Sequence, residues 1–479
     1  PLAKELLGMV KAPMRTDQAN AGGVVKPPAL DIEREALDHV WIHQAPWVEI
    51  AENDGLRVFD RGEGIYLYDV QGREYIDGIS GLWVVNAGHG RREIGEAMAE
   101  QASRLSYASA ASYTTVPATK LAAKIAELTP GDLSRVFFSS GGSEAVESAV
   151  KIAKQVQAMR GFPRRYKIIA RRGSYHGMTH GAMSLTSSRN ELHFGPFMYG
   201  VSYVPTPNQY RSDFGVQGEQ ADIMAAKYVE QEIESQGAET VAAVIAEPIS
   251  TSAGVHGPSK IYWQMLREIC DRHGVLLIAD EVIDGWGRCG TWFAMDQYGV
   301  TPDIMTMAKG LSSGYAPIAA TVVTPGVFEV FKENRDAYLG HLLTFGGHPV
   351  AAAAALKNIE IMEEEKLPER AAEMGAYLRT QLEELRSHPT VGDVRGVGML
   401  QALDLVSDKE ERKNFGRGHK FTDRVSDLLN ERGFLSRVWG VLNIAPPLIV
   451  TKAEIDRIVA IIDESLTVAE GEFASEIKG

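Results

Sequence analysis

Short apolar runs alternate with amphipathic stretches from about residue 130 onward. Runs such as VAAVIAE and VLLIAD are almost entirely apolar, which is typical of strands buried on both faces of a sheet. Strands that alternate with helices predict a mainly parallel sheet with helices on both faces, and hence an α/β fold. The predicted strands lie at 134–140, 166–170, 241–247, 275–280, 303–309 and 321–325, and predicted helices lie at 143–160 and 259–274.

The two ends of the chain follow other patterns. Residues 12–31 are rich in Ala, Gly and Pro and predict an arm, whereas residues 64–78 predict two short strands around a turn. After about residue 346, helices lead to the segment 394–406, which indicates a smaller α+β domain. Further helices are expected at about 91–105, 117–128 and 348–363. The predicted division is an N-terminal arm with part of a small domain at 1–80, a large domain at 81–345 and a C-terminal small domain at 346–479.

Chemically capable residues follow the predicted strands of the large sheet. The first strand ends in Ser-Gly-Gly-Ser at 140–143, and the second leads to Tyr175. Glu247, Asp280 and Lys309 each close a later strand. Because ligands of open parallel sheets bind beyond the carboxyl ends of the strands, we expect these groups to form an active site.

The glycine-rich turn places Gly142 and Ser143 at the start of a predicted helix. Unpaired N–H groups and the helix dipole favour an anion there, so a phosphate is a natural ligand. An ordinary helix cap is the alternative, and both interpretations stay open at this point. The segment matches neither GxGxxG nor GxxxxGK[ST], which disfavours a dinucleotide or ATP.

Asp280 and Lys309 suggest a specific cofactor. A lysine at a desolvated strand end can lose its proton and form a Schiff base, and an aspartate in the same cleft can hold a pyridinium proton. Together with a phosphate cradle, these roles are what pyridoxal 5'-phosphate requires. A buried structural ion pair is the alternative for the two residues.

Composition narrows the function classes. The chain has 479 residues, with 49 Lys+Arg against 63 Asp+Glu, and the net charge of −14 argues against nucleic acid as a partner. Its two cysteines, Cys270 and Cys289, cannot form a framework of disulfides. No apolar stretch is long enough to span a membrane, and the N-terminus does not resemble a signal peptide. We therefore expect a soluble, cytoplasmic protein of enzyme size.

Several long motifs resemble the class III pyridoxal-phosphate aminotransferases. The resemblance implies fold type I, with a large sheet domain and a smaller α+β domain. It also implies a homodimer, or a dimer of dimers, whose active sites are shared between subunits. The motifs that carry the resemblance are DEVIDGWGRCG (280–290), PDIMTMAKGLSSGYAPIAA (302–320), GSEAVESAVKIAK (142–154), SYHGMT (174–179) and TFGGHPVAAAA (344–354).

The resemblance implies a role for each matching residue. Lys309 would form the Schiff base and move the proton at the substrate carbon, and Asp280 would pair with the pyridine nitrogen. The remaining cofactor contacts would be Gly142 and Ser143 at the phosphate, Tyr175 and Val282 on the two ring faces, Glu247 behind them, and Thr344 from the partner subunit at the phosphate.

Three features of the sequence resemble those of the family branch whose members transfer amino groups from ω-amines to pyruvate. In the segment 78–90, Leu82 and Trp83 would line the substrate pocket. Ser252 stands where members that use 2-oxoglutarate commonly carry a glutamate. Ile283 stands where those members often have glutamine. The acceptor is therefore expected to be pyruvate, and the donor a primary amine or an ω-amino acid.

Two further positions concern the substrates. The segment 434–448 resembles the one that carries a mobile arginine, so Arg437 is the candidate for binding a carboxylate. Small residues around Ala111 predict room for a large amine. His176 and His180 have the spacing of metal ligands but lack a third ligand, so no metal is expected. An aminomutase, racemase, decarboxylase or 2-oxoglutarate-linked aminotransferase of the same family stays an alternative.

Overall fold

The computed structural model describes residues 28–45, 47–52, 56–187, 191–416 and 418–478. The chain divides into two compact units, one formed by residues 1–60 with 68–73 and the other by residues 61–67 with 74–479. In the first unit, α2 (Pro28–His39) and α3 (Trp47–Glu52) are described. The predicted arm lies outside the described residues up to residue 27, and α2 occupies its last positions. The predicted division near residues 80 and 345 stays a prediction.

A seven-stranded sheet forms the centre of the second unit. Its strand order is β4-β10-β9-β8-β7-β5-β6, and only β10 runs antiparallel to its neighbours. The prediction of a mainly parallel sheet is thus confirmed. The strands are β4 (Arg135–Ser139), β5 (Lys167–Arg171), β6 (Val201–Val204), β7 (Val241–Ala246), β8 (Leu276–Asp280), β9 (Ile304–Met307) and β10 (Ala319–Val323). The edge strand β6 was not predicted, because four residues with a serine in their midst give a weak pattern.

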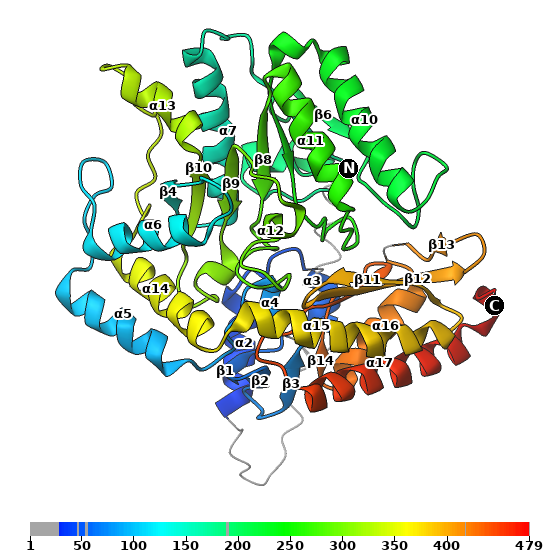
Figure 1. Cartoon of the computed structure of the whole chain (residues 1–479). Helices are drawn as coiled ribbons and strands as arrows, with labels where there is room; N and C mark the ends of the chain where they lie inside the picture. The colour runs from blue at the N-terminus through cyan, green and yellow to red at the C-terminus, as the bar shows by residue number, and fades with distance from the viewer. Residues whose placement is uncertain (1–27, 46, 53–55, 188–190, 417, 479) are drawn as a thin grey trace, which may run out of the picture. The chain divides into compact units, whose positions relative to one another are not determined.

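Helices cover both faces of this sheet because its central strands are apolar on both. Successive side chains of a strand point to opposite faces. Val244 of β7 belongs to the same apolar cluster as α10 (Glu219–Gln236) and α11 (Lys260–His273), whereas Ile245 packs in the cluster of α7 (Gly142–Met159). Figure 1 shows α7 and the α10–α11 pair on opposite sides of the strands.

The C-terminal part combines a small antiparallel sheet with helices, as the pattern after residue 346 predicts. Strand β12 (Leu400–Asp408) pairs with β11 (Val391–Val397), β13 (Lys413–Asn414) and β15 (Val441–Ile444). The helices of this part are α14 (Pro349–Glu364), α15 (Leu367–Glu384), α16 (Lys420–Glu431) and α17 (Lys452–Glu472). In Figure 1, α15, α16 and α17 lie beside these strands.

The remaining elements include a second small sheet and several helices. Strand β14 (Phe434–Leu435) pairs in parallel with β3 (Glu74–Asp77). The other elements are β1 (Phe59–Glu63), β2 (Tyr66–Asp69), α4 (Ser80–Trp83), α5 (Arg92–Arg104), α6 (Val116–Leu128), α8 (His180–Met183), α9 (Glu191–Phe194), α12 (Met295–Tyr298) and α13 (Pro325–Glu333), together with the short 3-10 helices η1 (Ala238–Thr240), η2 (Lys309–Leu311), η3 (Leu385–Ser387) and η4 (Ala474–Glu476).

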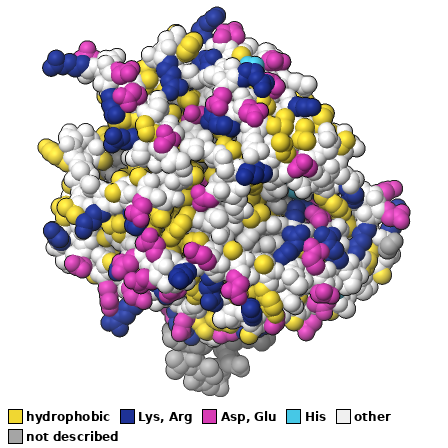
Figure 2. Space-filling view, in the orientation of Figure 1, with side chains coloured by type: hydrophobic (Ala, Val, Ile, Leu, Met, Phe, Trp, Pro, Cys, Tyr) yellow, Lys and Arg dark blue, Asp and Glu magenta, His cyan; other side chains and the backbone are white. Residues whose placement is uncertain are grey.

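The surface is charged with both signs. On the face that Figure 2 shows, Lys and Arg side chains are interspersed with Asp and Glu side chains over much of the surface. Among the described helices, none has both the length and the apolar character needed to cross a membrane.

Candidate active site

A cavity of about 160 Å³ lies where the carboxyl ends of the central strands meet. Most of the predicted cofactor contacts line it together, although they come from five different strand ends. The cavity is lined by Gly142, Ser143, Tyr175, His176, Gly177, Glu247, Ile249, Thr251, Asp280, Val282, Ile283 and Lys309. The carboxyl ends of these strands therefore bring the expected groups to one place.

Asp280 is the last residue of β8 and is held from three sides. His176 Nδ1 lies 2.6 Å from Asp280 Oδ2, and the Thr306 hydroxyl donates to Oδ1 at 2.9 Å. The backbone N–H of Val282 donates to the same oxygen at 3.1 Å. These three contacts hold the Asp280 carboxylate, and the residue is only 4% exposed. The side chain therefore has one fixed orientation at the edge of the cavity.

Glu247 follows β7 and is part of a buried ion pair. Its Oε2 lies 2.8 Å from a guanidinium nitrogen of Arg171, which is fully buried, and its Oε1 accepts the N–H of Tyr175 at 3.0 Å. Burial alone would raise the pKa of Glu247, but the charges of Arg171 and His176 and these hydrogen bonds lower it. Glu247 is therefore a carboxylate that holds the loop carrying Tyr175 and His176.

Lys309 lies two residues beyond β9 and has a left-handed backbone, with φ of 46°. Burial lowers the pKa of its amine to about 8, partly opposed by the negative charges of Asp280 and Asp284 and reinforced by the positive charge of Arg437. An amine with this pKa is uncharged in roughly a tenth of molecules at pH 7, far more often than an exposed lysine. It can therefore act as a nucleophile and as a proton carrier.

The helix N-terminus at the cavity has no side-chain cap. The N-cap of α7 is Gly141, which has none to offer, and the Ser143 hydroxyl instead accepts the N–H of Met178 at 3.0 Å. The site is also tight, because a Cβ atom on Gly142 would lie 2.8 Å from a methyl carbon of Val282. Of the two interpretations of this turn, the geometry favours the anion site over an ordinary cap.

Trp83 and Arg437 lie beside Lys309. The Lys309 amine is 5.5 Å from the centre of the Trp83 ring, and the Arg437 guanidinium carbon is 5.6 Å from the same centre. Arg437 also lies 4.5 Å from the ring of Trp439. One indole thus has two cations close to it, which keeps the predicted carboxylate-binding group near the reactive amine.

Trp83 and Arg437 lie beside Lys309 but are not among the residues that line this cavity, and neither are three other predicted residues within a single chain. Leu82 is exposed, and Ala111 lines a separate groove of about 1150 Å³. Thr344 adjoins that groove, and its carbonyl accepts the Tyr107 hydroxyl at 3.0 Å. The resemblance places Thr344 in the partner subunit's site, and the roles of all three residues stay predictions.

Sequence reasoning missed several residues that shape the site. His176 was considered only as a metal ligand, and Arg171, Thr251 and Thr306 were not considered. Arg171 ends a buried strand, where a charge requires a partner, and this signal was available. For Thr251 and Thr306 the sequence offers no such signal, because threonine is common in strands and turns.

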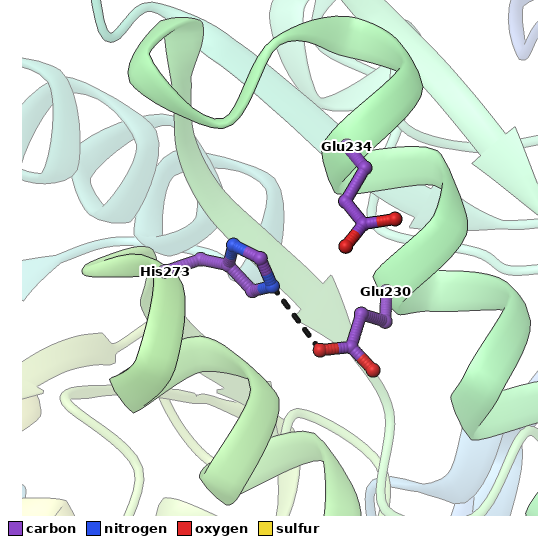
Figure 3. A group of neighbouring side chains, drawn as sticks. All are labelled: Glu230, Glu234 and His273. Atoms are coloured by element: carbon purple, nitrogen blue, oxygen red, sulfur yellow. Dashed lines mark hydrogen bonds and ion pairs between the residues drawn. The ribbon is translucent and has the colours of Figure 1, made fainter.

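Possible metal ligands lie elsewhere. Glu230 and Glu234 of α10 face His273 of α11, and their ligand atoms all lie within 4.8 Å of one another (Figure 3). His273 is 3.2 Å from a Glu230 oxygen that also pairs with Arg272. Arg272 therefore offsets the charge of Glu230, one of the two carboxylates of this group. His176 and His180 have separate partners, Asp280 and the carbonyl of Pro196.

The chain belongs to the class III aminotransferase family, since the family profile described as "Aminotransferase class-III" matches residues 49–466. It is therefore an aminotransferase of the fold type I class.

The chain is similar to several characterised relatives. It is 38% identical to a taurine–pyruvate aminotransferase of Bilophila wadsworthia, over 92% of this chain and 98% of that protein. It is 37% identical to the putrescine–pyruvate aminotransferase of Pseudomonas aeruginosa, over 88% and 94%. Among solved structures, a thermostable (S)-enantioselective omega-transaminase from Thermomicrobium roseum matches with a TM-score of 0.89 and 38% identity, over 92% and 99%.

Class III aminotransferases depend on pyridoxal 5'-phosphate, and the residues of the cavity fit this group. Two buried polar atoms in its lining, His176 Nε2 and the Thr251 hydroxyl, have no hydrogen-bond partner among the described residues. Buried polar atoms nearly always have a partner, so the Thr251 hydroxyl indicates a polar ligand, whereas His176 Nε2 lies 4.0 Å from the Glu247 carboxylate. The uncapped N-terminus of α7 suits a phosphate, and Lys309 and Asp280 suit an aldehyde and a pyridine nitrogen.

Proposed function

We propose that this enzyme uses pyridoxal 5'-phosphate to move an amino group from a primary amine or ω-amino acid to pyruvate, which becomes alanine. The observation that carries the proposal is the arrangement of Lys309, Asp280 and Arg437. A lysine with a lowered pKa shares one cavity with a buried aspartate, and an arginine lies 5.6 Å from the centre of the same Trp83 ring that the lysine approaches. These are the groups that an amine-to-oxo-acid exchange requires.

Pyruvate is the proposed acceptor because the chain lacks two residues that are common in members that use 2-oxoglutarate. Ser252 and Ile283 occupy positions where glutamate and glutamine are common in members that use 2-oxoglutarate, and Ile283 lines the cavity. Two relatives are named for pyruvate as acceptor, which supports the same choice. With one candidate arginine for a carboxylate, a monocarboxylic oxo acid is the better fit.

Different residues of the chain would carry out different parts of the reaction. When bound, the cofactor supplies an aldehyde and an electron-withdrawing ring. Asp280 keeps the proton on the pyridine nitrogen, and His176 and Thr306 hold that carboxylate in place. The uncharged Lys309 amine would take the proton from the substrate carbon next to nitrogen and deliver it to the carbon on the other side of that nitrogen. Tyr175 and Val282 restrain the ring from its two faces.

Arg437 allows one pocket to serve two kinds of substrate. Its guanidinium binds the carboxylate of pyruvate or alanine with paired hydrogen bonds. For an apolar amine, the same pocket has to present Trp83 rather than a charge, so the arginine has to turn aside. The two aromatic rings near Arg437, Trp83 and Trp439, offer a surface for both positions.

The complete site requires a second copy of the chain. Ala111 lines the groove that lies apart from the Lys309 cavity, and Thr344 follows Leu343, which also lines it; we assign Ala111 and Thr344 to the neighbouring subunit's site in a homodimer or a dimer of dimers. The small side chains around Ala111 would then leave room for a large amine. A cytoplasmic location agrees with this chemistry, which needs a metabolic supply of oxo acids.

A donor screen with two acceptors tests the proposal. Amines of rising size, ω-amino acids and alanine are each incubated with pyruvate or with 2-oxoglutarate. We expect turnover with pyruvate, initial-rate patterns of a two-stage exchange and tolerance of large donors. Activity with 2-oxoglutarate alone would contradict the acceptor. Product in large excess over enzyme, formed without any acceptor, would identify an aminomutase, racemase or decarboxylase instead.

A further inference from the structure

Arg288 is a fully buried arginine that has no carboxylate partner among the described residues. One of its terminal nitrogens donates to Ser80 Oγ at 2.9 Å and to Asn86 Oδ1 at 2.6 Å. The other donates to the carbonyls of Pro446 at 2.6 Å and Met399 at 3.3 Å. A charge buried among neutral acceptors is costly, and burial lowers the pKa of Arg288 to about 10. Such an arrangement needs a reason beyond packing.

The first contact holds the segment that carries Trp83. Ser80 and Trp83 both have left-handed backbones, with φ of 50° and 55°, which L side chains rarely adopt. The Ser80 hydroxyl accepts from Arg288 and donates to the carbonyl of Ala445 at 2.8 Å. Arg288 thus anchors the strained start of this segment, which places the indole 5.5 Å from the Lys309 amine.

The second contact of Arg288, with Asn86, leads to Gly310, the residue that follows Lys309. The Asn86 amide accepts from Arg288 and donates to the carbonyl of Trp286 at 2.7 Å. It packs directly on Gly310, where an added Cβ would meet the Asn86 amide nitrogen and would also lie 2.8 Å from the Trp286 Cβ. Gly310 follows Lys309, whose φ is 46°. Asn86, held by Arg288, therefore packs against Gly310 in the turn that directs the Lys309 side chain.

We propose that Arg288 is a positioning residue, which acts through Ser80 on Trp83 and through Asn86 on Lys309 and so fixes the pocket wall and the amine relative to each other. The proposal rests on the proposed function for the meaning of Lys309 and Trp83. A lysine in its place would keep the charge, but its single nitrogen could not reach four acceptors on three separate segments. The planar guanidinium explains why an arginine is needed.

The test compares Arg288→Lys and Asn86→Ala with a matched control, Arg370→Lys. Arg370 also donates to two backbone carbonyls, those of Ile449 and Val450, but lies outside the cavity lining. The first readout uses the protein freed of cofactor. Competitive acetylation followed by peptide mass spectrometry gives the pH midpoint of Lys309 reactivity. The second readout is kcat and KM for a series of donors of rising size.

We expect both site variants to raise the acetylation midpoint of Lys309 by about 1 pH unit, because the loosened turn admits water to the amine. We also expect kcat to fall about tenfold or more and the dependence on donor size to flatten, whereas Arg370→Lys changes neither. Unchanged midpoints and donor profiles, with only a lower thermal midpoint, would overturn the proposal. The acetylation readout needs no turnover, so it separates this outcome from a failure of the proposed reaction.

Discussion

His176 Nδ1 lies 2.6 Å from Asp280 Oδ2, and both side chains are buried at the edge of the cavity. This contact joins the loop after β5 to the end of β8, two strands separated by β7 in the sheet. The far nitrogen of the ring lies 4.0 Å from Glu247, which is itself paired with Arg171. Asp280, His176, Glu247 and Arg171 thus form a chain of buried polar side chains, of which the first three line the cavity.

Asp280→Asn should lower kcat by about 10²- to 10⁴-fold, because a neutral amide cannot keep the pyridine nitrogen protonated. His176→Gln should cost less, about tenfold, since Thr306 and the Val282 N–H still hold the carboxylate. Steady-state rates with one amine and pyruvate measure both. Near-normal turnover of Asp280→Asn, with the cofactor still bound, would exclude the role given to this carboxylate.

Lys309→Ala should lower turnover by at least about 10³-fold and should remove the visible absorbance band that depends on the lysine–cofactor bond. The exposed Lys332→Ala serves as the control and should keep both. Absorbance spectra and initial rates are recorded on the same preparations. A fully active Lys309→Ala enzyme would refute the assignment of the reactive amine.

The acetylation rate of Lys309 should rise with pH through a midpoint near 8, because burial lowers the pKa of the amine to about 8. The direction follows from the charge: only the uncharged amine reacts, so reactivity is low below the midpoint and constant above it. N-acetyl-lysine methyl ester measured in the same tubes should titrate about two units higher. A coincident midpoint for Lys309 and this reference would show that the amine is solvated.

The strand-end residues of the site follow from the sequence, but their supporting partners do not. Asp280 and Lys309 close apolar runs, and parallel strands bring their carboxyl ends to one edge, so periodicity and topology suffice. The contacts of His176 and Arg171 depend on side-chain directions across strands that are distant in the sequence. The Arg288 contacts with Ser80, Asn86 and Pro446 join segments more than 150 positions apart. No local pattern encodes such distances.

Arg437→Gln should affect substrates according to their charge. With alanine as donor or pyruvate as acceptor, kcat/KM should fall about 10- to 100-fold, because a charge-assisted pair of hydrogen bonds is lost. The half-reaction with an apolar amine, followed by the change in cofactor absorbance in the absence of acceptor, should change less than about threefold. Arg104→Gln, at the exposed end of α5, is the control. Equal losses for both substrate kinds would contradict a carboxylate-specific role.

The hydrogen bonds of His388 should contribute to the stability of the C-terminal part in a pH-dependent way. Hydrogen bonds to Glu470, at 2.9 Å, and to Asp463, at 2.8 Å, raise the pKa of the imidazole, against the opposing effect of burial. A raised folded-state pKa means that the stabilisation is fully present below the ordinary value of about 6.5 and disappears as the pH rises through the folded value. His388→Gln should therefore lower the thermal midpoint by roughly 1–2 °C at pH 6, and by less at pH 9. The exposed His193→Gln should show no such trend. A His388→Gln deficit that grows with pH would mean that the neutral imidazole is the stabilising form.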